Sequence, residues 1–167
     1  MPIAQNGLHE ARGYETLLED IMQTGTQMKD LPGLGRVLIV DDEANIRKII
    51  RMALTKTGYD VVEAEGGEKA IEVLGADDNP STVDLILCDL RMPYFHGMET
   101  IAHFRNRYPS VPVIVLTGYP NDRIAATLLQ QGVADYLVKP VPKVELLASV
   151  ATAMESRMDP IRTFGSG

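Results

Sequence analysis

Apolar and polar positions along the chain fall into short runs with two alternating periodicities. Four runs rich in β-branched residues, which favour strands, cover residues 36–40, 60–64, 83–88 and 111–116, and a weaker fifth run covers residues 135–138. Between and after these runs, apolar residues recur at three- and four-residue spacing, which predicts helices over residues 46–57, 68–74, 98–107, 122–131 and 143–154. Such alternation is typical of an α/β fold, in which helices cover both faces of a parallel sheet.

The strands differ in polarity, and this difference predicts where each one lies in the sheet. The first, third and fourth runs are almost continuously apolar, as strands buried on both faces are. The second strand brings Glu63 and Glu65, which favour a place at the edge. We therefore expect a doubly wound, five-stranded parallel sheet with five helices.

Two segments lie outside this alternation. Within residues 1–35, the pattern predicts an amphipathic helix over residues 9–29 and then a linker over residues 31–35. The apolar side of the helix consists of Ala11, Tyr14, Leu18, Ile21 and Met22. A helix of this kind is marginally stable alone in water, so we expect it to pair with a second copy in a homodimer. Docking on its own domain and a disordered leader are the alternatives. Residues 36–156 form the predicted domain and residues 157–167 a predicted disordered tail.

Composition narrows the class of protein. The chain has 167 residues, of which 45% are hydrophobic, so it can bury a real core. A net charge of -7 argues against direct binding of nucleic acid. Cys88 is the only cysteine, which excludes an internal disulfide and fits a reducing compartment. The sequence shows neither a signal-peptide pattern nor an apolar run of about 20 residues, so we expect a cytoplasmic protein without membrane insertion.

Polar side chains stand where the predicted strands end. The carboxyl ends of parallel strands meet at one rim of the sheet, and open α/β sheets bind ligands there. The residues concerned are Asp41, Asp42 and Glu43 after the first strand, Asp89 at the end of the third, Thr117 after the fourth and Lys139 after the fifth. Taken singly, each has a structural explanation, because acids cap helix starts and the other residues suit turns and loops. Taken together, they indicate a site.

The combination of side chains at this rim suits phosphoryl transfer. Several crowded carboxylates repel one another unless a cation joins them. Oxygen ligands with open positions suit Mg²⁺, which keeps some of its waters and binds phosphate oxygens. A lysine and a threonine beside that metal can hold the remaining oxygens of a phosphoryl group. An aspartate can itself be the nucleophile and form an acyl phosphate.

Four short motifs at the rim resemble those of one family, the receiver domains of two-component response regulators. They are Asp41-Asp42-Glu43, then Asp89-Leu90-Arg91-Met92-Pro93 followed by Gly97, then Thr117-Gly118, and finally Tyr136-Leu137-Val138-Lys139-Pro140. The resemblance extends over residues 36–155. It implies a flavodoxin-like fold with strand order 2-1-3-4-5.

The resemblance also implies a role for each rim residue. Asp42 would be the principal ligand of Mg²⁺, and Asp41 would bind the ion directly or through water. Asp89 and the backbone carbonyl of Arg91 would complete the ligand set.

Asp89 would also be the phosphoacceptor. Thr117 and Lys139 would each hold a phosphoryl oxygen, and Thr117 and Tyr136 would form the conformational switch. A cis peptide bond is implied at Lys139–Pro140, where proline lowers its cost.

The function implied is that of a phosphorylation-dependent signalling switch rather than an enzyme with its own turnover. The phosphoryl donor would be a histidine kinase or a histidine phosphotransfer protein. Phosphorylation would change the face made by the fourth helix, the fifth strand and the fifth helix, and so control a downstream protein effector. A stand-alone receiver and a fragment of a larger regulator with a missing output domain both remain open.

Three other classes of protein fit the sequence less well. A phosphatase or phosphotransferase with an aspartate nucleophile would need a second aspartate as general acid two residues after Asp89, but Arg91 occupies that position. A nucleotide-binding enzyme would need a phosphate loop such as G-x-x-x-x-G-K-[ST], which the sequence lacks. A degenerate receiver used only for docking would not be expected to keep the acids, Thr117 and Lys139 together.

Overall fold

The computed structural model of the chain describes residues 19, 23, 33–76, 83–90 and 97–158. The chain divides into two units, Met1–Gly33 and Leu34–Gly167, and the second contains the sheet. The helix predicted over residues 9–29 lies outside the described residues except for Glu19 and Gln23, which are helical and exposed. Within the described residues, no helix is both long enough and apolar enough to span a membrane.

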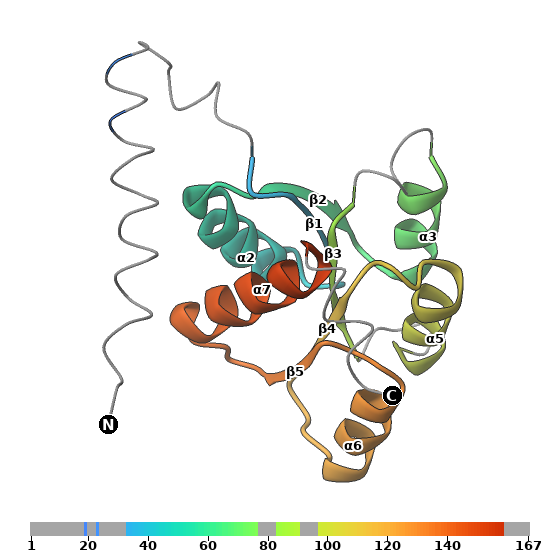
Figure 1. Ribbon diagram of the computed structural model, residues 1–167. Helices are drawn as coiled ribbons and strands as arrows, with labels where there is room; N and C mark the ends of the chain where they lie inside the picture. The colour runs from blue at the N-terminus through green and yellow to red at the C-terminus, as the bar shows by residue number, and fades with distance from the viewer. Residues whose placement is uncertain (1–18, 20–22, 24–32, 77–82, 91–96, 159–167) are drawn as a thin grey trace, which may run out of the picture. The chain divides into compact units, whose positions relative to one another are not determined.

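Five parallel strands form one sheet in the order β2-β1-β3-β4-β5 (Figure 1). They are β1 (Arg36–Val40), β2 (Asp60–Ala64), β3 (Leu85–Asp89), β4 (Val113–Thr117) and β5 (Asp135–Val138). The predicted fold class, strand order and edge position of β2 are therefore confirmed. β3 and β4 each begin two residues later than predicted, because Val83 and Val111 are buried but precede the paired strands.

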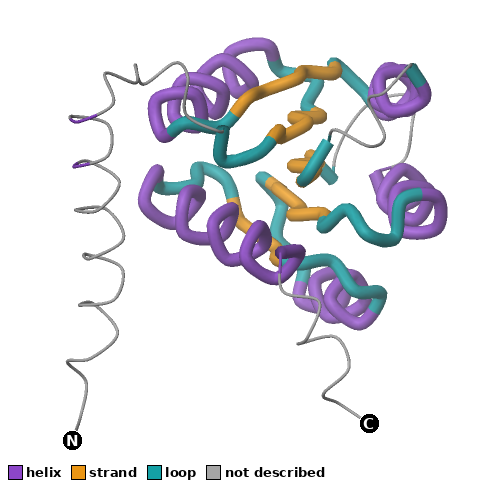
Figure 2. The backbone as a smooth tube through the Cα atoms, turned by 45° about the horizontal axis from the view of Figure 1, so that its top comes forward, coloured by secondary structure: helices purple, strands orange, loops and turns teal. Residues whose placement is uncertain are grey.

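Five helices of the described residues connect and follow the strands. They are α2 (Ala44–Thr57), α3 (Gly67–Gly75), α5 (Gly97–Arg107), α6 (Asp122–Gln130) and α7 (Lys143–Met158). Helices α2 and α7 cover one face of the sheet, and α3, α5 and α6 cover the other (Figure 2). Helix α7 continues to Met158, past residue 157 where we expected the tail to begin.

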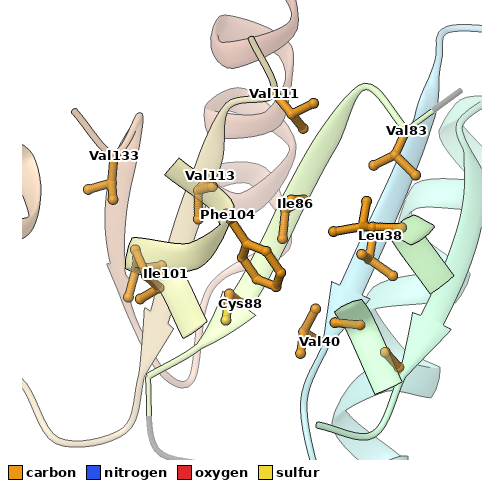
Figure 3. Close-up of a cluster of buried hydrophobic side chains, with 14 of the residues drawn as sticks. Leu38, Val40, Val83, Ile86, Cys88, Ile101, Phe104, Val111, Val113 and Val133 are labelled. Carbon is orange, nitrogen blue, oxygen red and sulfur yellow. The ribbon is translucent and has the colours of Figure 1, made fainter. Parts of the chain in front are cut away.

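Each face of the sheet has its own hydrophobic core, because successive side chains of a strand point to opposite faces. On the face covered by α3, α5 and α6, Phe104 and Ile101 of α5 pack over Ile86 and Cys88 of β3 (Figure 3). Burial, together with the nearby charges of Asp89 and Asp41, raises the pKa of the Cys88 thiol. Cys88 is thus a protonated thiol within the core.

On the other face, Ile50 and Leu54 of α2 pack with Leu146 and Val150 of α7 over the sheet. Ile49 belongs to the same apolar repeat of the sequence, but its side chain is 65% exposed. Because a helix has 3.6 residues per turn, neighbouring side chains point in different directions around its axis, so Ile49 is turned away from the buried direction of Ile50. The helix ends as predicted at Thr57, where Gly58 adopts a positive φ of 116°.

The register of the sheet aligns the ends of its strands. Val40 pairs with Cys88 across β1 and β3, and Asp89 pairs with Leu116 across β3 and β4. Thr117 pairs with Val138 across β4 and β5. The polar residues that end or follow these strands are therefore brought to a single rim.

Candidate functional site

Two buried aspartates occupy the centre of this rim. Asp41 directly follows β1, and Asp89 is the last residue of the neighbouring strand β3. Asp41 is 0% exposed and Asp89 is 3% exposed. Burying a carboxylate is costly without a partner, and neighbouring carboxylates repel each other. The pair therefore needs a positive group beside it.

Lys139 supplies that positive group. Its Nζ donates a hydrogen bond of 2.7 Å to Asp41 Oδ2 and lies 3.2 Å from Asp89 Oδ2. Burial by itself lowers the pKa of Lys139, but the hydrogen bond to Asp41 and the charges of Asp89 and Asp41 outweigh burial, so this pKa lies above its ordinary value. The side chain is thus an ammonium at neutral pH, held between the two carboxylates.

A backbone hydrogen bond between the ends of β4 and β5 positions this lysine. Lys139 follows β5, and its N–H donates to the carbonyl of Thr117 at 2.8 Å. The Lys139–Pro140 peptide bond is cis, as the sequence motif implied.

The turn that follows β1 carries further carboxylates. Asp41 Oδ1 accepts a hydrogen bond of 2.9 Å from the backbone N–H of Glu43. Carboxylate oxygens of Asp41, Asp42 and Glu43 all lie within 4.8 Å of one another, with Asp42 and Glu43 exposed. Asp42 is thus open to a ligand from solvent, while Asp41 faces inward.

The residues at this rim fit a divalent cation with oxygen ligands. The rim carries more negative than positive charge. The three carboxylates of Asp41, Asp42 and Asp89 and the one ammonium of Lys139 have a net charge of two negative units. Carboxylate oxygens that are close together, with one exposed to solvent, suit Mg²⁺, which keeps part of its water shell. The carboxylate oxygens within 4.8 Å of one another are those of Asp41, Asp42 and Glu43, and Asp89 is linked to Asp41 through Lys139. These four are the described side chains that could hold the ion.

Thr117 is placed at the same rim as the last residue of β4. Its side chain is fully buried, and its Oγ1 accepts a hydrogen bond of 3.1 Å from the backbone N–H of Tyr119. The hydroxyl therefore holds the loop that leads into α6, and it can also donate its own proton to an anionic oxygen.

Tyr136 contacts the far end of the same loop. Its hydroxyl oxygen accepts a hydrogen bond of 3.3 Å from the backbone N–H of Asn121. Asn121 caps α6, because its side chain accepts from the N–H groups of Arg123 and Ile124. Thr117 and Tyr136 are thus joined through the two ends of one short loop.

The β3–α5 connection is described only at its two ends. Arg91, predicted to offer its backbone carbonyl to the metal, lies outside the described residues, as do Met92 and Pro93. At the end of the connection, a Cβ at Gly97 would lie 1.8 Å from the carbonyl oxygen of Leu90. Only glycine permits this approach, which accounts for the glycine that follows the Asp89 motif.

One residue near the rim was not singled out from the sequence. Arg47 of α2 donates from Nη1 to the backbone carbonyl of Asp41 at 2.7 Å, and its Nε lies 3.3 Å from Glu63 Oε1 of β2. From sequence, an arginine on an amphipathic helix is normally predicted to face solvent. The signal that points to it is the acid Glu63 on the strand that packs beside α2.

Comparison with known families gives one match that covers most of the chain. Residues 37–151 match the response regulator receiver domain. Among curated proteins, the chain is 40% identical over 121 residues to the transcriptional regulatory protein GlrR of Escherichia coli. It is 34% identical over 120 residues to the DNA-binding transcriptional regulator NtrC of the same organism. The matched segments are 71% and 72% of this chain but only 26% and 25% of those relatives.

Solved structures give the same result for the fold. A response regulator receiver domain protein from Clostridium thermocellum superposes with a TM-score of 0.69 at 26% identity, covering 74% of this chain and 97% of that one. A response regulator receiver protein from Pseudomonas putida superposes with a TM-score of 0.66 at 31% identity, covering 73% of this chain and 99% of that one.

Proposed function

Because the chain belongs to the response regulator receiver domain family, we propose that it is a phosphorylation-dependent switch whose phosphoacceptor is Asp89. The observation that carries this proposal is the placement of Asp89 at the sheet rim, 3.2 Å from Lys139 and beside buried Asp41. A turn residue or a helix cap would not require a half-buried ammonium shared by two buried carboxylates.

In the proposed reaction, a carboxylate oxygen of Asp89 attacks the phosphorus of a phosphohistidine on the donor. The new P–O bond makes an acyl phosphate, and the P–N bond breaks with its electron pair remaining on the imidazole nitrogen. Lys139 and Thr117 hold phosphoryl oxygens, the first by charge and the second by a hydrogen bond from its hydroxyl. When bound by Asp41, Asp42 and Asp89, Mg²⁺ would neutralise negative charge on the transferring group.

The structure offers a surface that a protein donor can use. A mainly apolar groove of about 460 Å³ lies between α2 and the start of α7, and Lys139 and Pro140 are among the residues that line it. Exposed Ile49 and Met52 contribute to it from α2. A histidine kinase or a histidine phosphotransfer protein docked there would be adjacent to Asp89, which supports such proteins as donors.

The output is proposed to pass through α6, β5 and α7, because Thr117 and Tyr136 both contact the loop that begins α6. The chain spans about a quarter of the length of GlrR and NtrC, whose names describe transcriptional regulation. We propose a downstream protein effector, joined to or separate from this domain, with no direct contact between the receiver and nucleic acid.

Phosphorylation with a small donor tests the proposal. The protein is incubated with acetyl phosphate and Mg²⁺, and its intact mass is measured. We expect the parent and Asp60→Asn, a change at the opposite end of the sheet, to gain one phosphoryl group, and Asp89→Asn to gain none. Equal phosphorylation of Asp89→Asn and the parent would contradict the assignment.

A further inference from the structure

Arg47 links the turn after β1 to the edge strand β2. Its Nη1 donates to the backbone carbonyl of Asp41 at 2.7 Å, and its Nε lies 3.3 Å from Glu63 Oε1. The side chain is only 17% exposed. The contact with Asp41 is a hydrogen bond, whereas Nε is buried without a hydrogen bond and meets Glu63 only as an ion pair. Because it is shielded from water, such a charge contact is stronger than one on the surface.

The backbone N–H and the backbone carbonyl of Asp41 are both connected to β2, the first directly and the second through Arg47. The N–H of Asp41 donates to the carbonyl of Ala64, the last residue of β2, at 3.1 Å. The carbonyl of Asp41 is held through Arg47, which is itself paired with Glu63 of the same strand. That carbonyl belongs to the planar peptide unit joining Asp41 to Asp42, so fixing it also fixes the direction in which the chain enters Asp42.

We propose that Arg47 is a positioning residue for cation binding, which it serves by orienting the peptide unit between Asp41 and Asp42. This inference rests on the proposed Mg²⁺ site. A positive guanidinium on the carbonyl oxygen of Asp41 also makes that oxygen a poor ligand for a second cation. The carboxylates of Asp41 and Asp42 are then the groups of this turn that face the metal.

Only an arginine side chain can make both of these contacts. One guanidinium can reach the carbonyl of Asp41 and the carboxylate of Glu63 at once through different nitrogens, whereas lysine has a single nitrogen. Arg51 provides a matched control, because its Nη1 pairs with Glu63 Oε2 at 2.6 Å from one turn further along α2. Among the described contacts, the Arg51 side chain makes no hydrogen bond to Asp41.

The test compares Mg²⁺ affinity in four versions of the 167-residue chain: the parent, Arg47→Lys, Arg51→Lys and Glu63→Asp. All three substitutions keep the local charge, so changes in affinity cannot come from long-range electrostatics. Binding is followed by the amide shifts of Asp41 and Asp42 in an NMR titration with MgCl₂. Urea midpoints without metal are measured in parallel, to separate loss of binding from loss of stability.

We expect Arg47→Lys to bind Mg²⁺ about tenfold more weakly, in line with changes to groups that orient metal ligands. Glu63→Asp, which withdraws the carboxylate from Arg47, should weaken binding in the same direction. Arg51→Lys should stay within about twofold of the parent, since it touches only the shared acid.

Unchanged affinity in both Arg47→Lys and Glu63→Asp would overturn the inference. So would an equal loss in Arg51→Lys and Arg47→Lys, or losses that simply follow the urea midpoints. A parent protein that does not bind Mg²⁺ would contradict the proposed metal site, and with it this inference. That outcome can be distinguished from failure of the inference because the titration of the parent is sufficient to reveal it.

Discussion

Lys139 Nζ lies 2.7 Å from Asp41 Oδ2, although the two residues are 98 positions apart in the chain. The same ammonium lies 3.2 Å from Asp89 Oδ2. It therefore compensates two buried carboxylates that would otherwise repel each other. In the absence of a metal, the stability of the rim depends on this lysine.

Replacing Lys139 by methionine should destabilise the protein in Mg²⁺-free buffer. Breaking a fully buried ion pair costs roughly 3–5 kcal/mol, and because the Lys139 side chain is 16% exposed we expect about 2 kcal/mol. Mg²⁺ should restore part of this loss, because it supplies positive charge to the same carboxylates. Urea denaturation with and without Mg²⁺ measures both effects.

Lys69→Met is the matched control for this substitution. Lys69 also forms an ion pair, with Glu72 at 2.9 Å, but both side chains are largely exposed. Such surface pairs contribute little, so Lys69→Met should leave the urea midpoint close to that of the parent. A Lys139→Met protein as stable as the parent would show that the rim carboxylates do not need the ammonium.

Much of this architecture could be predicted from the sequence, because a parallel sheet covered on both faces gives strong signals. β1 and β2 have the predicted bounds because each run is rich in β-branched residues and is bordered by polar or turn residues. The weaker run of β5, with Val138 as its one β-branched residue, has the predicted bounds as well. At β3 and β4 the prediction started too early, because Val83 and Val111 are apolar and buried without joining the ladder. Hydrophobicity reports burial, whereas strand pairing also depends on the register between neighbours.

The residues of the rim could be named in advance, but their contacts could not. Chain order places Asp41, Asp89, Thr117 and Lys139 at strand ends, yet only the register brings Lys139 between the two acids. Arg47 was missed because charged helix residues usually face solvent, and its partners are a backbone carbonyl and an edge-strand acid.

Mg²⁺ should stabilise the parent protein and not Asp42→Ala. A ligand that binds only the folded state stabilises it by about 2.7 kcal/mol at a concentration of 100 Kd. Asp42 is exposed, so its removal should cost little stability without metal but should remove most of the response to it. This is checked by measuring the thermal unfolding temperature without MgCl₂ and with roughly 10 mM MgCl₂, a concentration suited to a weak site. Glu72→Ala, another exposed acid, should respond like the parent, and a parent insensitive to Mg²⁺ would contradict the site.

Occupation of the site should change the environment of Tyr136. Thr117 Oγ1 accepts from the N–H of Tyr119, and Tyr136 accepts from the N–H of Asn121 in the same loop. If Thr117 donates to a phosphoryl oxygen, the occupied site interacts more favourably with one conformation of this loop than with the others. The population of loop conformations then shifts toward that one. Beryllofluoride should therefore move the NMR signals of Tyr136 and Asn121 in the parent, and move them less in Thr117→Val. Unchanged signals in a parent whose site is demonstrably occupied would rule out this switch.

Substitutions in the groove between α2 and α7 should affect only transfer from a protein donor. Ile49 and Met52 are 65% and 48% exposed and line this groove. Only a minority of interface residues cost more than about 1 kcal/mol of binding when truncated, and we expect Ile49, as an exposed apolar side chain of the groove, to be one of them. Ile49→Ser should therefore slow phosphotransfer from a cognate kinase about tenfold. Transfer from acetyl phosphate, which needs no docking surface, should be unchanged.

Leu129→Ser gives the comparison for the groove. Leu129 of α6 is 50% exposed but does not line the groove, so its replacement should leave both reactions at the parent's rate. Equal slowing by Ile49→Ser and Leu129→Ser, or slowing with acetyl phosphate as well, would exclude the groove as the docking surface.

The central claim, that Asp89 receives the phosphoryl group, is tested most directly by locating the modified residue. The protein is phosphorylated with acetyl phosphate and Mg²⁺ and then treated with borohydride, which reduces an aspartyl phosphate to homoserine. The positions of homoserine are read from peptide fragments by mass spectrometry. Asp41 and Asp42 are internal controls, because both lie at the same rim. We predict homoserine at position 89 and nowhere else, whereas homoserine at position 41 or 42, or its absence from all three, would contradict the account.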